Sequence, residues 1–494
     1  MKQKIGIIGG GFAGTMTAVQ LVLQSDTFEK NQLKNDLEIF IINQKQSFNK
    51  GIAYNSYSDE HILNVSTIKM SAFPDKPTHF LDWVLKKEEF KKYDYDWLAN
   101  AYLPRKLYGE YLSKIWEETT KKAIQKNISI LVIDSVVDAI QLNSAENSVE
   151  ISIQNKDKIV VDNCIIATGN QLPRNPTIKN MDFYKSKNYF QNPWIQSVVE
   201  NLDSEKSVLL IGNGLTMVDT VLSILENTRK EFKGKIYSVS PNGFSILPHR
   251  NNGIKYTQFA EELEKLSSHL TVKLSLLEIV KLINKHIKLV RALGLSAESV
   301  IDSIRPYTQT IWRNLSDKEK KIFMSRLRHL WGVARHRIPL HIHDKIQALR
   351  IEGKLEIHSG KLIDIVESTE EGEYIEIEFF DKKEKITKKI KVGRIINCTG
   401  AETNLMNLDD SNFLKKCLLE RVITQDSLKL GICTDTTTFQ IIDENGNKHQ
   451  NLFTIGSNLK GELWESTAIN ELRMQAQMLA KGLILSKKLK MRFD

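Results

Sequence analysis

The sequence predicts an α/β protein that contains two Rossmann-like dinucleotide-binding domains and a helical insertion. The prediction rests on two glycine-rich turns, at residues 9–14 and 212–216. An apolar strand that ends in Thr-Gly follows each turn at a distance, at residues 164–169 and 395–400. A single glycine turn would be weak evidence, but four signals in this order indicate a duplicated nucleotide-binding fold.

The first turn has the G-x-G-x-x-G spacing, with an apolar strand before it and a predicted helix at about 12–23 after it. Gly9 makes the turn, Gly11 clears space for a pyrophosphate, and Gly14 lets the helix pack closely on the strand. The partly positive helix N-terminus then faces the phosphate charge. We therefore assign cofactor binding here to Gly9, Gly11, Phe12, Ala13 and Gly14.

The second predicted strand, residues 37–42, is followed by Asn43. An acidic residue usually stands at this place and binds the ribose of the nucleotide. An amide can also hydrogen-bond a ribose hydroxyl, but it lacks the charge assistance of a carboxylate. We expect Asn43 to bind the cofactor, although more weakly than an acidic residue would.

Composition agrees with a large soluble protein. The 494 residues suffice for two or three domains, and 41% of them are hydrophobic. The sequence contains no run of 18 or more apolar residues, so it predicts no membrane span. The four cysteines form no C-x-x-C pair, which disfavours disulfide-reductase chemistry and favours a reducing cytoplasm.

The net charge is +9, and the lysines are scattered without an aromatic-basic motif for nucleic acid. We therefore expect a small-molecule substrate, no nucleic acid and no integral membrane contact. The basic stretch 481–492 is either the end of a solvated helix or a membrane-surface or partner contact. The sequence leaves the oligomeric state open.

The order of segments predicts nested domains. Residues 1–170 and 395–494 form one nucleotide-binding domain, and residues 171–256 and 351–394 form a second; by the resemblance described below, the first is the FAD-binding domain and the second the NAD(P)-binding domain. Residues 257–350 form the helical insertion, because their apolar residues recur at three- and four-residue spacing. Strands are expected to return at 355–357, 374–380 and 385–392.

Several segments resemble the bacterial FAD/NAD(P)-binding protein family, which is related to class B flavin monooxygenases and to the ornithine and lysine N-hydroxylases. The likeness lies in residues 51–54 (GIAY), 61–65 (HILNV), 70–74 (MSAFP), 103–112 (LPRKLYGEYL), 192–194 (NPW), 215–219 (LTMVD), 335–339 (RHRIP) and 463–468 (LWESTA). The resemblance implies a glutathione-reductase-like flavoprotein architecture, with FAD at the first turn and NAD(P)H at the second. The implied cofactor-binding residues are Thr168, Gly169, Gly212, Gly214, Leu215, Thr216 and Gly400.

The chain departs from the family pattern at two places. An arginine-rich stretch is expected after the strand that ends near Ser240, but the chain reads Ser240-Pro241-Asn242-Gly243. The choice between NADH and NADPH therefore stays open, with Arg250 as a substitute cation. The histidine of the monooxygenase fingerprint is also absent, since Lys185-Ser186 stands at a comparable place.

Two residues are candidates for catalysis. A long excursion from about Gly51 to Asn127 interrupts the first domain and is expected to cover the flavin. Asn64 lies in this excursion, where it either hydrogen-bonds the flavin or stabilises a loop. Arg105 follows Pro104 at a predicted helix start, where it either binds a pyrophosphate or substrate carboxylate or forms a surface ion pair.

The densest basic cluster is Arg335-His336-Arg337, in a segment expected to be extended or irregular before Pro339. It binds either substrate or phosphate, or it has a structural role. The nearby histidines lack the partners of a zinc site, so no metal is predicted.

The segment 455–468 is similar to the closing segment of a flavoprotein, where a helix N-terminus faces the flavin pyrimidine. There Gly456, Thr467 and Ala468 are expected to bind the cofactor. Trp464 either lines the substrate cavity or packs in the core.

The predicted activity is that of an FAD-dependent NAD(P)H oxidoreductase. NAD(P)H reduces FAD, and the enzyme then hydroxylates a small polar substrate, as an N-hydroxylase-like monooxygenase. Two alternatives remain: a flavin dehydrogenase or oxidase of a C–N or C–O bond, and a non-catalytic redox-sensing or scaffold protein.

Overall fold

The computed structural model describes residues 2–25, 37–143, 145–228, 231–250, 255–268, 274–368 and 374–493, with side chains as far as residue 486. The chain divides into two compact units. Unit 1 comprises Met1–Ser56, Val65–Gln171 and Thr403–Asp494, and unit 2 comprises Tyr57–Asn64 and Leu172–Glu402. The short segment Tyr57–Asn64 thus belongs to unit 2, although it lies within the excursion from the first predicted domain. Which nucleotide each unit binds stays a prediction.

Unit 1 is built on a six-stranded sheet with the order β15-β16-β7-β1-β2-β3. All neighbours pair in parallel except β15 and β16. The strands are β1 (Gln3–Ile8), β2 (Leu37–Ile42), β3 (Ser129–Ile133), β7 (Asn163–Ile166), β15 (Gln440–Ile442) and β16 (Lys448–Thr454). Because the parallel strands run the same way, their carboxyl ends meet at one edge, where ligands bind in open α/β sheets.

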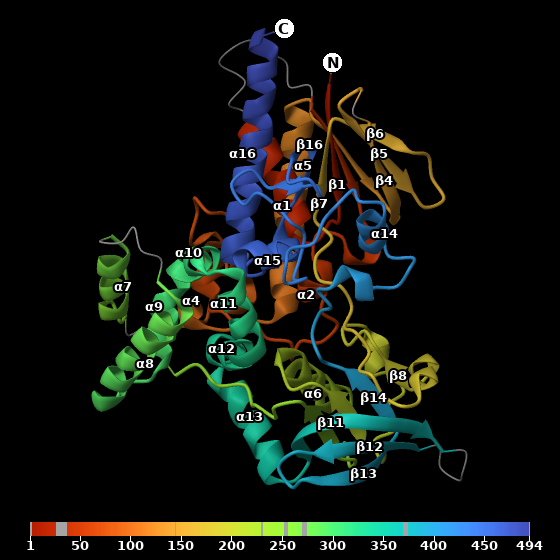
Figure 1. Ribbon diagram of the computed structural model, residues 1–494, viewed down its shortest axis with the longest axis vertical. Coiled ribbons are helices and arrows are strands. Elements are labelled where there is room, and N and C mark those ends of the chain that lie inside the picture. The colour runs from red at the N-terminus through yellow and green to blue at the C-terminus, as the bar shows by residue number, and fades with distance from the viewer. Residues whose placement is uncertain are drawn as a thin grey trace. The chain divides into compact units, whose positions relative to one another are not determined.

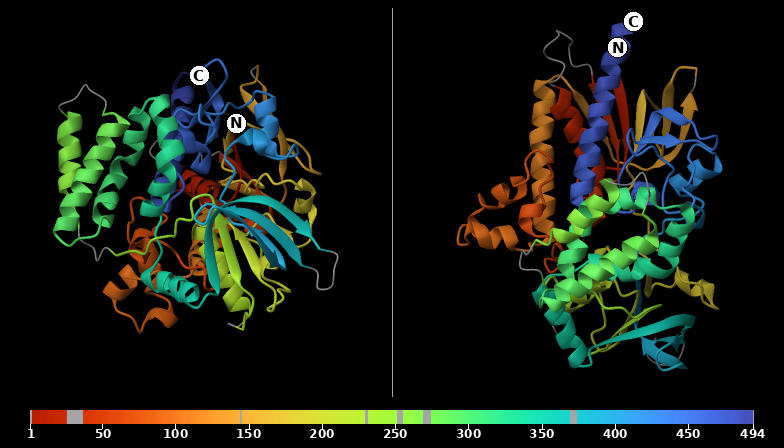
Figure 2. Two further views of the ribbon diagram at one scale, coloured as in Figure 1. Left: turned by 60° about the horizontal axis from the view of Figure 1, so that its bottom comes forward. Right: turned by 60° about the vertical axis from the view of Figure 1, so that its left-hand side comes forward.

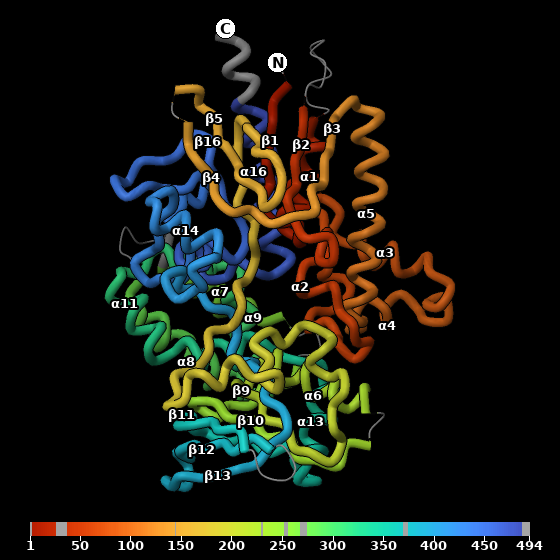
Figure 3. The backbone as a smooth tube through the Cα atoms, turned by 90° about the vertical axis from the view of Figure 1, so that its right-hand side faces the viewer, coloured from red at the N-terminus to blue at the C-terminus, as the bar shows by residue number. Residues whose placement is uncertain are grey.

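Alternate residues of these strands face two different cores, as the two-residue period of a strand requires. Ile7 and Ile41 pack with α1 (Phe12–Gln24) and α16 (Ile469–Phe493), and α5 (Arg105–Gln125) also packs on α1 (Figure 1). Ile8 and Ile42 face the opposite side, where a three-stranded sheet covers them (Figure 3). That sheet consists of β4 (Val137–Asn143), β5 (Ser148–Ile153) and β6 (Ile159–Val161).

Short helices complete unit 1. They are α2 (Gly51–Tyr54), α3 (His79–Val84), α4 (Tyr95–Asn100), α14 (Phe413–Leu419) and α15 (Lys460–Leu463). In the excursion, Phe80, Tyr108 and Tyr111 are fully buried and their rings lie against one another. This aromatic core holds the excursion on the N-terminal part of α5.

Unit 2 contains a seven-stranded sheet with the order β13-β12-β11-β10-β9-β14-β8. Its strands are β8 (Tyr189–Phe190), β9 (Val208–Ile211), β10 (Ile236–Ser240), β11 (Leu355–Glu367), β12 (Ile375–Asp381), β13 (Ile386–Val392) and β14 (Arg394–Asn397). Helices α6 (Leu215–Asn227) and α13 (Leu340–Ile351) share a core with one face of this sheet. The strand predicted at 355–357 is much longer in the structure, because β11 first pairs with β10 and then bends to pair with β12.

The predicted helical insertion is helical. It contains α7 (Gln258–Ser268), α8 (Leu276–Ala292), α9 (Glu298–Ile304), α10 (Thr308–Asn314), α11 (Asp317–Ile322) and α12 (Arg328–Arg335), which form one group in Figure 2. Phe259, Leu282 and Ile301 belong to a separate hydrophobic core within this group. The insertion therefore has packing of its own.

None of the helices that the structure describes is long and apolar enough to cross a lipid bilayer. The basic stretch 481–492 continues α16, and its side chains beyond residue 486 lie outside the described part.

Candidate functional site

The first glycine turn joins β1 to α1 in unit 1. Gly9 has a φ of +104°, and a Cβ there would lie 2.3 Å from the carbonyl oxygen of Ala167. A Cβ on Gly14 would lie 1.9 Å from the carbonyl oxygen of Gly9. Both positions therefore require glycine for the fold itself. Gly11 is the N-cap of α1 and provides no side-chain hydrogen bond, so the first N–H groups of the helix can bind an anion.

Asn43 stands at the end of β2 and supports this turn. Its Oδ1 accepts a hydrogen bond of 2.9 Å from the N–H of Gly10, and its Nδ2 donates to the carbonyl oxygen of Gln44 at 2.6 Å. The amide therefore holds the turn in shape. Its predicted contact with a ribose stays a prediction.

The structure brings the first Thr-Gly strand and the C-terminal segment to this turn. A Cβ on Gly456 would lie 3.6 Å from the Cβ of Ala13. Asn458 Nδ2 donates to Thr168 Oγ1 at 3.4 Å. Gly169 follows with a φ of +72°. Residues that are far apart in the sequence thus surround the N-terminus of α1.

Buried polar atoms in α16 and in the segment 457–466 before it lack a hydrogen-bond partner among the described residues. These include Ser457 Oγ, Ser466 Oγ and Gln475 Nε2. Gln475 Oε1 accepts from the N–H of Gly456 at 2.9 Å, so this side chain is oriented toward the C-terminal segment. Buried polar groups are normally satisfied, and a polar ligand would satisfy these. The predicted residues Thr467, exposed, and Ala468, half-buried, directly precede α16.

Trp464 has an unusual backbone conformation before this helix, with φ +60° and ψ −60°. The N–H of Glu465 donates to the carbonyl oxygen of Leu463 at 2.7 Å, which makes a γ-turn around Trp464. The amino group of Lys460 lies 5.5 Å from the centre of the Trp464 ring. The structure thus gives Trp464 a turn geometry, while its contact with substrate stays a prediction.

Aromatic rings and one cation lie beside the first turn. The Phe12 ring contacts the rings of Tyr54 and Tyr108, with centroids 6.5 Å away in each case. Burial raises the pKa of Tyr54, and the positive charge of Arg105 opposes part of that rise. Arg105 is the first residue of α5 and follows the N-cap Pro104, as predicted. The predicted catalytic role of Arg105 is not tested by this geometry.

The second turn repeats the design of the first in unit 2. Gly212 has a φ of +108°, and a Cβ there would lie 2.6 Å from the carbonyl oxygen of Cys398. Cys398 directly precedes Thr399 and Gly400, just as Ala167 precedes Thr168 and Gly169. In both units the first glycine of the turn therefore packs against the strand that ends in Thr-Gly.

Gly214 is the N-cap of α6, again without a side-chain hydrogen bond. A Cβ on Gly214 would meet no atom within 4 Å. Leu215 and Thr216 form the first turn of the helix. The N-terminal N–H groups of α6 are thus available to an anion, as at the first site.

The basic cluster is split by the structure. Arg335 is the last residue of α12, His336 is exposed with extended backbone, and Arg337 is buried. The predicted extended or irregular segment therefore begins at His336, because α12 continues through Arg335. Arg337 forms ion pairs with Glu298 and with Asp302, the latter at 2.7 Å. The Arg337 guanidinium is thus paired within unit 2, and binding of substrate by the cluster stays a prediction.

Sequence reasoning missed the partner of this arginine. Glu298 also lies 3.2 Å from His249 Nδ1, and it accepts a hydrogen bond of 2.6 Å from the N–H of Arg250. His249 Nε2 in turn lies 3.1 Å from the carbonyl oxygen of Asn64. The predicted residue Asn64 is thus held through its backbone within unit 2. No periodicity in the sequence pointed to Glu298.

In the described ranges, no group of three or more histidine, cysteine, aspartate and glutamate side chains could hold a metal ion.

Comparison with known proteins agrees with this geometry. Residues 6–171 match a family model described as FAD-NAD(P)-binding. No curated protein matches the sequence.

Solved structures share the fold over nearly the whole chain. An L-lysine 6-monooxygenase from Pseudomonas syringae is 14% identical with a TM-score of 0.63, over 98% of this chain and 99% of the other. The ornithine N-hydroxylase from Kutzneria sp. 744 is 12% identical with a TM-score of 0.61, over 99% and 100%. A bacillithiol disulfide reductase from Staphylococcus aureus is 12% identical with a TM-score of 0.55, over 99% of both. The chain therefore carries an FAD-NAD(P)-binding domain in residues 6–171 and has the fold of the two-domain flavoprotein oxidoreductases.

Proposed function

We propose that this protein is an FAD-dependent oxidoreductase that takes electrons from NAD(P)H and hydroxylates an amino group of a small polar substrate. The observation that carries the proposal is the repeated turn. In both units, a helix N-terminus without a side-chain cap follows a glycine that packs on a Thr-Gly strand. Two such sites in one chain suit two dinucleotides, one in each unit.

The buried polar atoms at α16 support FAD in unit 1. Ser457, Ser466 and Gln475 each have an atom without a partner among the described residues, beside Gly456 and the first turn. Bound FAD would supply the redox chemistry. The protein's own residues would bind the pyrophosphate at Gly11 and aim the N-terminus of α16 at the ring system, which favours negative charge on it.

The cysteines support oxygenation over thiol chemistry. Cys164, Cys398 and Cys417 are buried, and burial raises the pKa of the Cys398 and Cys417 thiols to about 12 in each case. The thiolate is the reactive form of cysteine, so these residues are poor nucleophiles at neutral pH. This argues against the disulfide-reductase branch of the structural neighbours. Two of the neighbours are, by name, a lysine monooxygenase and an ornithine N-hydroxylase.

The proposed reaction balances with one NAD(P)H and one O₂. NAD(P)H supplies a hydride, which carries two electrons and one hydrogen, and one oxygen atom enters the N–H bond of the substrate. The other oxygen atom leaves as water, whose two hydrogens come from the hydride and from one proton of the solution. A dehydrogenase or oxidase would instead take its electrons from the substrate. The direction of electron flow separates these two alternatives.

The test is an anaerobic absorbance titration of the FAD-loaded protein with NADH and with NADPH, followed by oxygen. We expect bleaching of the flavin by a nicotinamide nucleotide and recovery in air, with hydroxylamine formed when lysine, ornithine or a diamine is present. Flavin that neither nucleotide reduces would overturn the proposal in favour of a substrate oxidase. Reduction with slow reoxidation and no product from any amine would leave a reductase and refute the hydroxylation step.

A variant of the second turn tests which site holds the nicotinamide nucleotide. Gly214→Val adds a side chain where no atom lies within 4 Å, but where the pyrophosphate would pass. We expect this variant to retain FAD and to lose reduction by NAD(P)H. Gly332→Ala is the control. Gly332 lies in α12, away from the glycine turn, and a Cβ there also meets no atom within 4 Å. Loss of FAD from Gly214→Val would reverse the assignment of the two sites.

A further inference from the structure

In a dinucleotide-binding fold the residue that binds the ribose follows the second strand, and in unit 2 that strand is β10. The N–H of Gly212 donates to the carbonyl oxygen of Val239 at 2.8 Å, and Ser238 Oγ donates to the carbonyl oxygen of Gly212 at 3.1 Å. A dinucleotide on this turn therefore has its adenosine ribose beside Ser240. The loop that follows, Ser240-Pro241-Asn242-Gly243, has neither a carboxylate for a ribose hydroxyl nor a cation for a 2′-phosphate.

Tertiary structure brings other residues to this loop. Ser359 of β11 is the pairing partner of Ser240, and its Oγ donates to the carbonyl oxygen of Pro241 at 3.3 Å. The β12–β13 hairpin reaches the same point. Lys382 donates its N–H to the carbonyl oxygen of Ser359 at 2.7 Å and its Nζ to the carbonyl oxygen of Pro241 at 2.7 Å.

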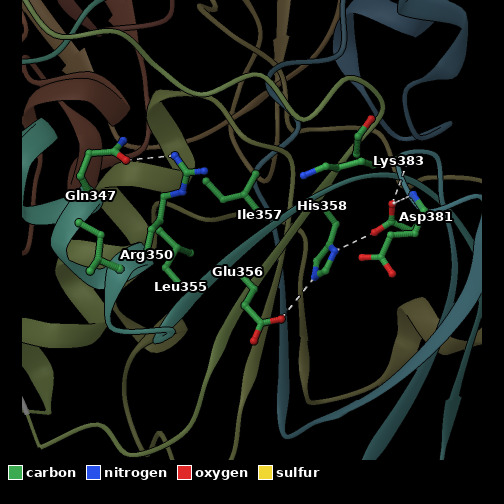
Figure 4. A pocket seen from close by; sticks show the side chains of 11 residues that line it. Gln347, Arg350, Leu355, Glu356, Ile357, His358, Asp381 and Lys383 are labelled. Atoms are coloured by element: carbon green, nitrogen blue, oxygen red, sulfur yellow. Dashed lines mark hydrogen bonds and ion pairs between the residues drawn. The ribbon is translucent and has the colours of Figure 1, made fainter.

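A pocket of about 440 Å³ opens beside Ser359, within the size range of small-molecule sites. Arg350 of α13 and Lys383 of the hairpin line it, and their charged ends extend toward each other from opposite sides (Figure 4). Arg350 Nη1 lies 3.5 Å from Ser245 Oγ, so the pocket also borders the loop that follows β10. The two cations come from segments that are separate in the sequence.

The acidic residues that line the pocket are already neutralised. Glu356 pairs with Lys235 at 2.6 Å. Glu384 pairs with Lys388 at 2.5 Å, and Asp381 lies 3.0 Å from His358 Nδ1 and 3.5 Å from Lys388.

The two cations are not neutralised in this way. The described contacts of the Arg350 guanidinium are to Ser245 and to Gln347 Oε1, at 3.1 Å for the latter, which are uncharged partners. For Lys383 Nζ, the described part of the chain provides neither an ion pair nor a hydrogen bond. Two positive charges therefore line a pocket on β11, whose residue Ser359 contacts the loop after β10, and they attract an anion.

We propose that Arg350 and Lys383 bind the 2′-phosphate of NADPH and thereby select NADPH over NADH. The inference rests on the proposed function, because it requires a nicotinamide dinucleotide at the Gly212 turn. A phosphate monoester carries close to two negative charges, and a guanidinium binds it through two parallel hydrogen bonds. NADH has only a hydroxyl at this position, so the two cations contribute little to its binding.

The experiment compares 2′,5′-ADP with 5′-ADP as probes that bind to the FAD-loaded protein, by calorimetry. We expect the wild type to bind 2′,5′-ADP at least about tenfold more tightly, the effect of one charge-assisted hydrogen bond. Lys383→Ala and Arg350→Gln should each lose about tenfold in affinity for 2′,5′-ADP and keep their affinity for 5′-ADP. Both side chains are exposed, so neither substitution disturbs a core.

Lys391→Ala is the matched control. Lys391 is an exposed lysine on the same hairpin, so its replacement by alanine removes the same charge as Lys383→Ala does. Unlike Lys383, it does not line the pocket. It should bind both probes as the wild type does. Equal affinity of the wild type for both probes, or equal losses in Lys391→Ala and Lys383→Ala, would overturn the proposal. So would inorganic phosphate that binds as tightly as 2′,5′-ADP, since the pocket would then hold free phosphate.

Failure of this inference is distinguishable from failure of the proposed function. If 2′,5′-ADP binds selectively but neither NADPH nor NADH reduces the flavin, the phosphate site stands and the proposed reaction fails. If both nucleotides reduce the flavin equally and the probes bind equally, the reaction stands and the phosphate site fails.

Discussion

The glycines of the two turns divide into those that the fold needs and those that a ligand needs. A Cβ on Gly9 or Gly14 would lie within 2.3 Å of a backbone oxygen. A Cβ on Gly11 would lie 3.6 Å from the Cα of Gly51, an ordinary contact, and one on Gly214 would meet nothing within 4 Å. Because the fold leaves room at Gly11 and Gly214, the proposed pyrophosphate contact, and not the packing of the chain, would account for glycine there.

This division predicts that Gly11→Ala folds but binds FAD poorly. The added methyl group would stand where the pyrophosphate approaches the N-terminus of α1. We expect at least about a tenfold loss of FAD affinity, which corresponds to about 1.4 kcal/mol. Flavin absorbance per protein after dialysis measures this loss. Gly482→Ala, in the interior of α16 with free space for a Cβ, is the control and should retain FAD. Full flavin content in Gly11→Ala would contradict the assignment of the first site.

Glu298 shows how a single buried residue joins three segments. Its side chain is 5% exposed, and it faces Arg337, His249 and the N–H of Arg250. Burial alone would raise the pKa of Glu298, but these hydrogen bonds and the Arg337 charge lower it to about 2. The folded protein therefore holds this carboxylate ionised well below its ordinary range.

We expect Glu298→Gln to destabilise the protein by about 3 kcal/mol, because the buried guanidinium of Arg337 loses one of its two carboxylate partners. The pKa of Glu298 falls from 4.5 to about 2 on folding. Its contribution is thus complete above about pH 4.5 and is lost as the pH falls toward 2. Chemical denaturation of both proteins at several pH values should show their difference shrinking over that window.

Glu376→Gln is the control for this experiment. Glu376 forms an exposed ion pair with Lys389 at 2.8 Å, so its loss should cost less than about 1 kcal/mol. A Glu298→Gln effect as small as the control effect would contradict a structural role for the Arg337 network.

At the scale of elements, the helical insertion is held by caps as well as by its core. Ser275 begins α8 and Ser316 begins α11, each in a capping box with the glutamate three residues later. Glu319 of the second box also accepts a hydrogen bond of 2.8 Å from the N–H of Leu276. The two helix starts are therefore linked, and the insertion gains order beyond its apolar contacts.

We predict that Ser275→Ala weakens the first turn of α8 by about 1 kcal/mol. Hydrogen exchange of the amides in that turn should become about fivefold faster, as this energy implies. Ser275→Thr should retain most of the protection, since threonine also caps helices. Flavin reduction by NAD(P)H should stay unchanged, and unchanged exchange in Ser275→Ala would show that the cap contributes nothing.

At the scale of the whole molecule, each unit has its own sheet and its own hydrophobic cores. The first turn, the Thr168 strand and the Gly456 segment come from the beginning, middle and end of the chain, and all of them border the proposed FAD site. A ligand that binds only the folded arrangement stabilises it by mass action. Stability of unit 1 should therefore depend on FAD.

We expect removal of FAD to lower the free energy of unfolding of unit 1 by about 2.7 kcal/mol relative to protein with FAD at a hundred times its Kd. Thermal unfolding of the stripped and reloaded protein, followed through helix α16, measures this difference. Adding FAD back should restore the transition. A transition that does not respond to FAD would show that the flavin does not bind the folded unit.

The sequence by itself determined the local parts of this protein. Apolar strands, glycine turns and the following helices are short-range patterns, so β1, α1, β2, β9 and α6 lie where their residues predict them. Spacing also placed the helical insertion between two strands of one sheet. These features depend on neighbours in the chain, which a single sequence shows directly.

Only the tertiary structure decided which distant side chains meet. Arg337, predicted for substrate, is buried because Glu298 and Asp302 of α9 come to face it. The loop after β10 lacks a cation of its own, and the pairing of β10, β11 and β12 brings Lys382 to the carbonyl oxygen of Pro241 and Lys383 to the neighbouring pocket. Such contacts follow from strand order and helix packing over long sequence separations, for which no local pattern is required. The sequence therefore located the two glycine turns, and the packing of distant segments determined which charged side chains lie near them.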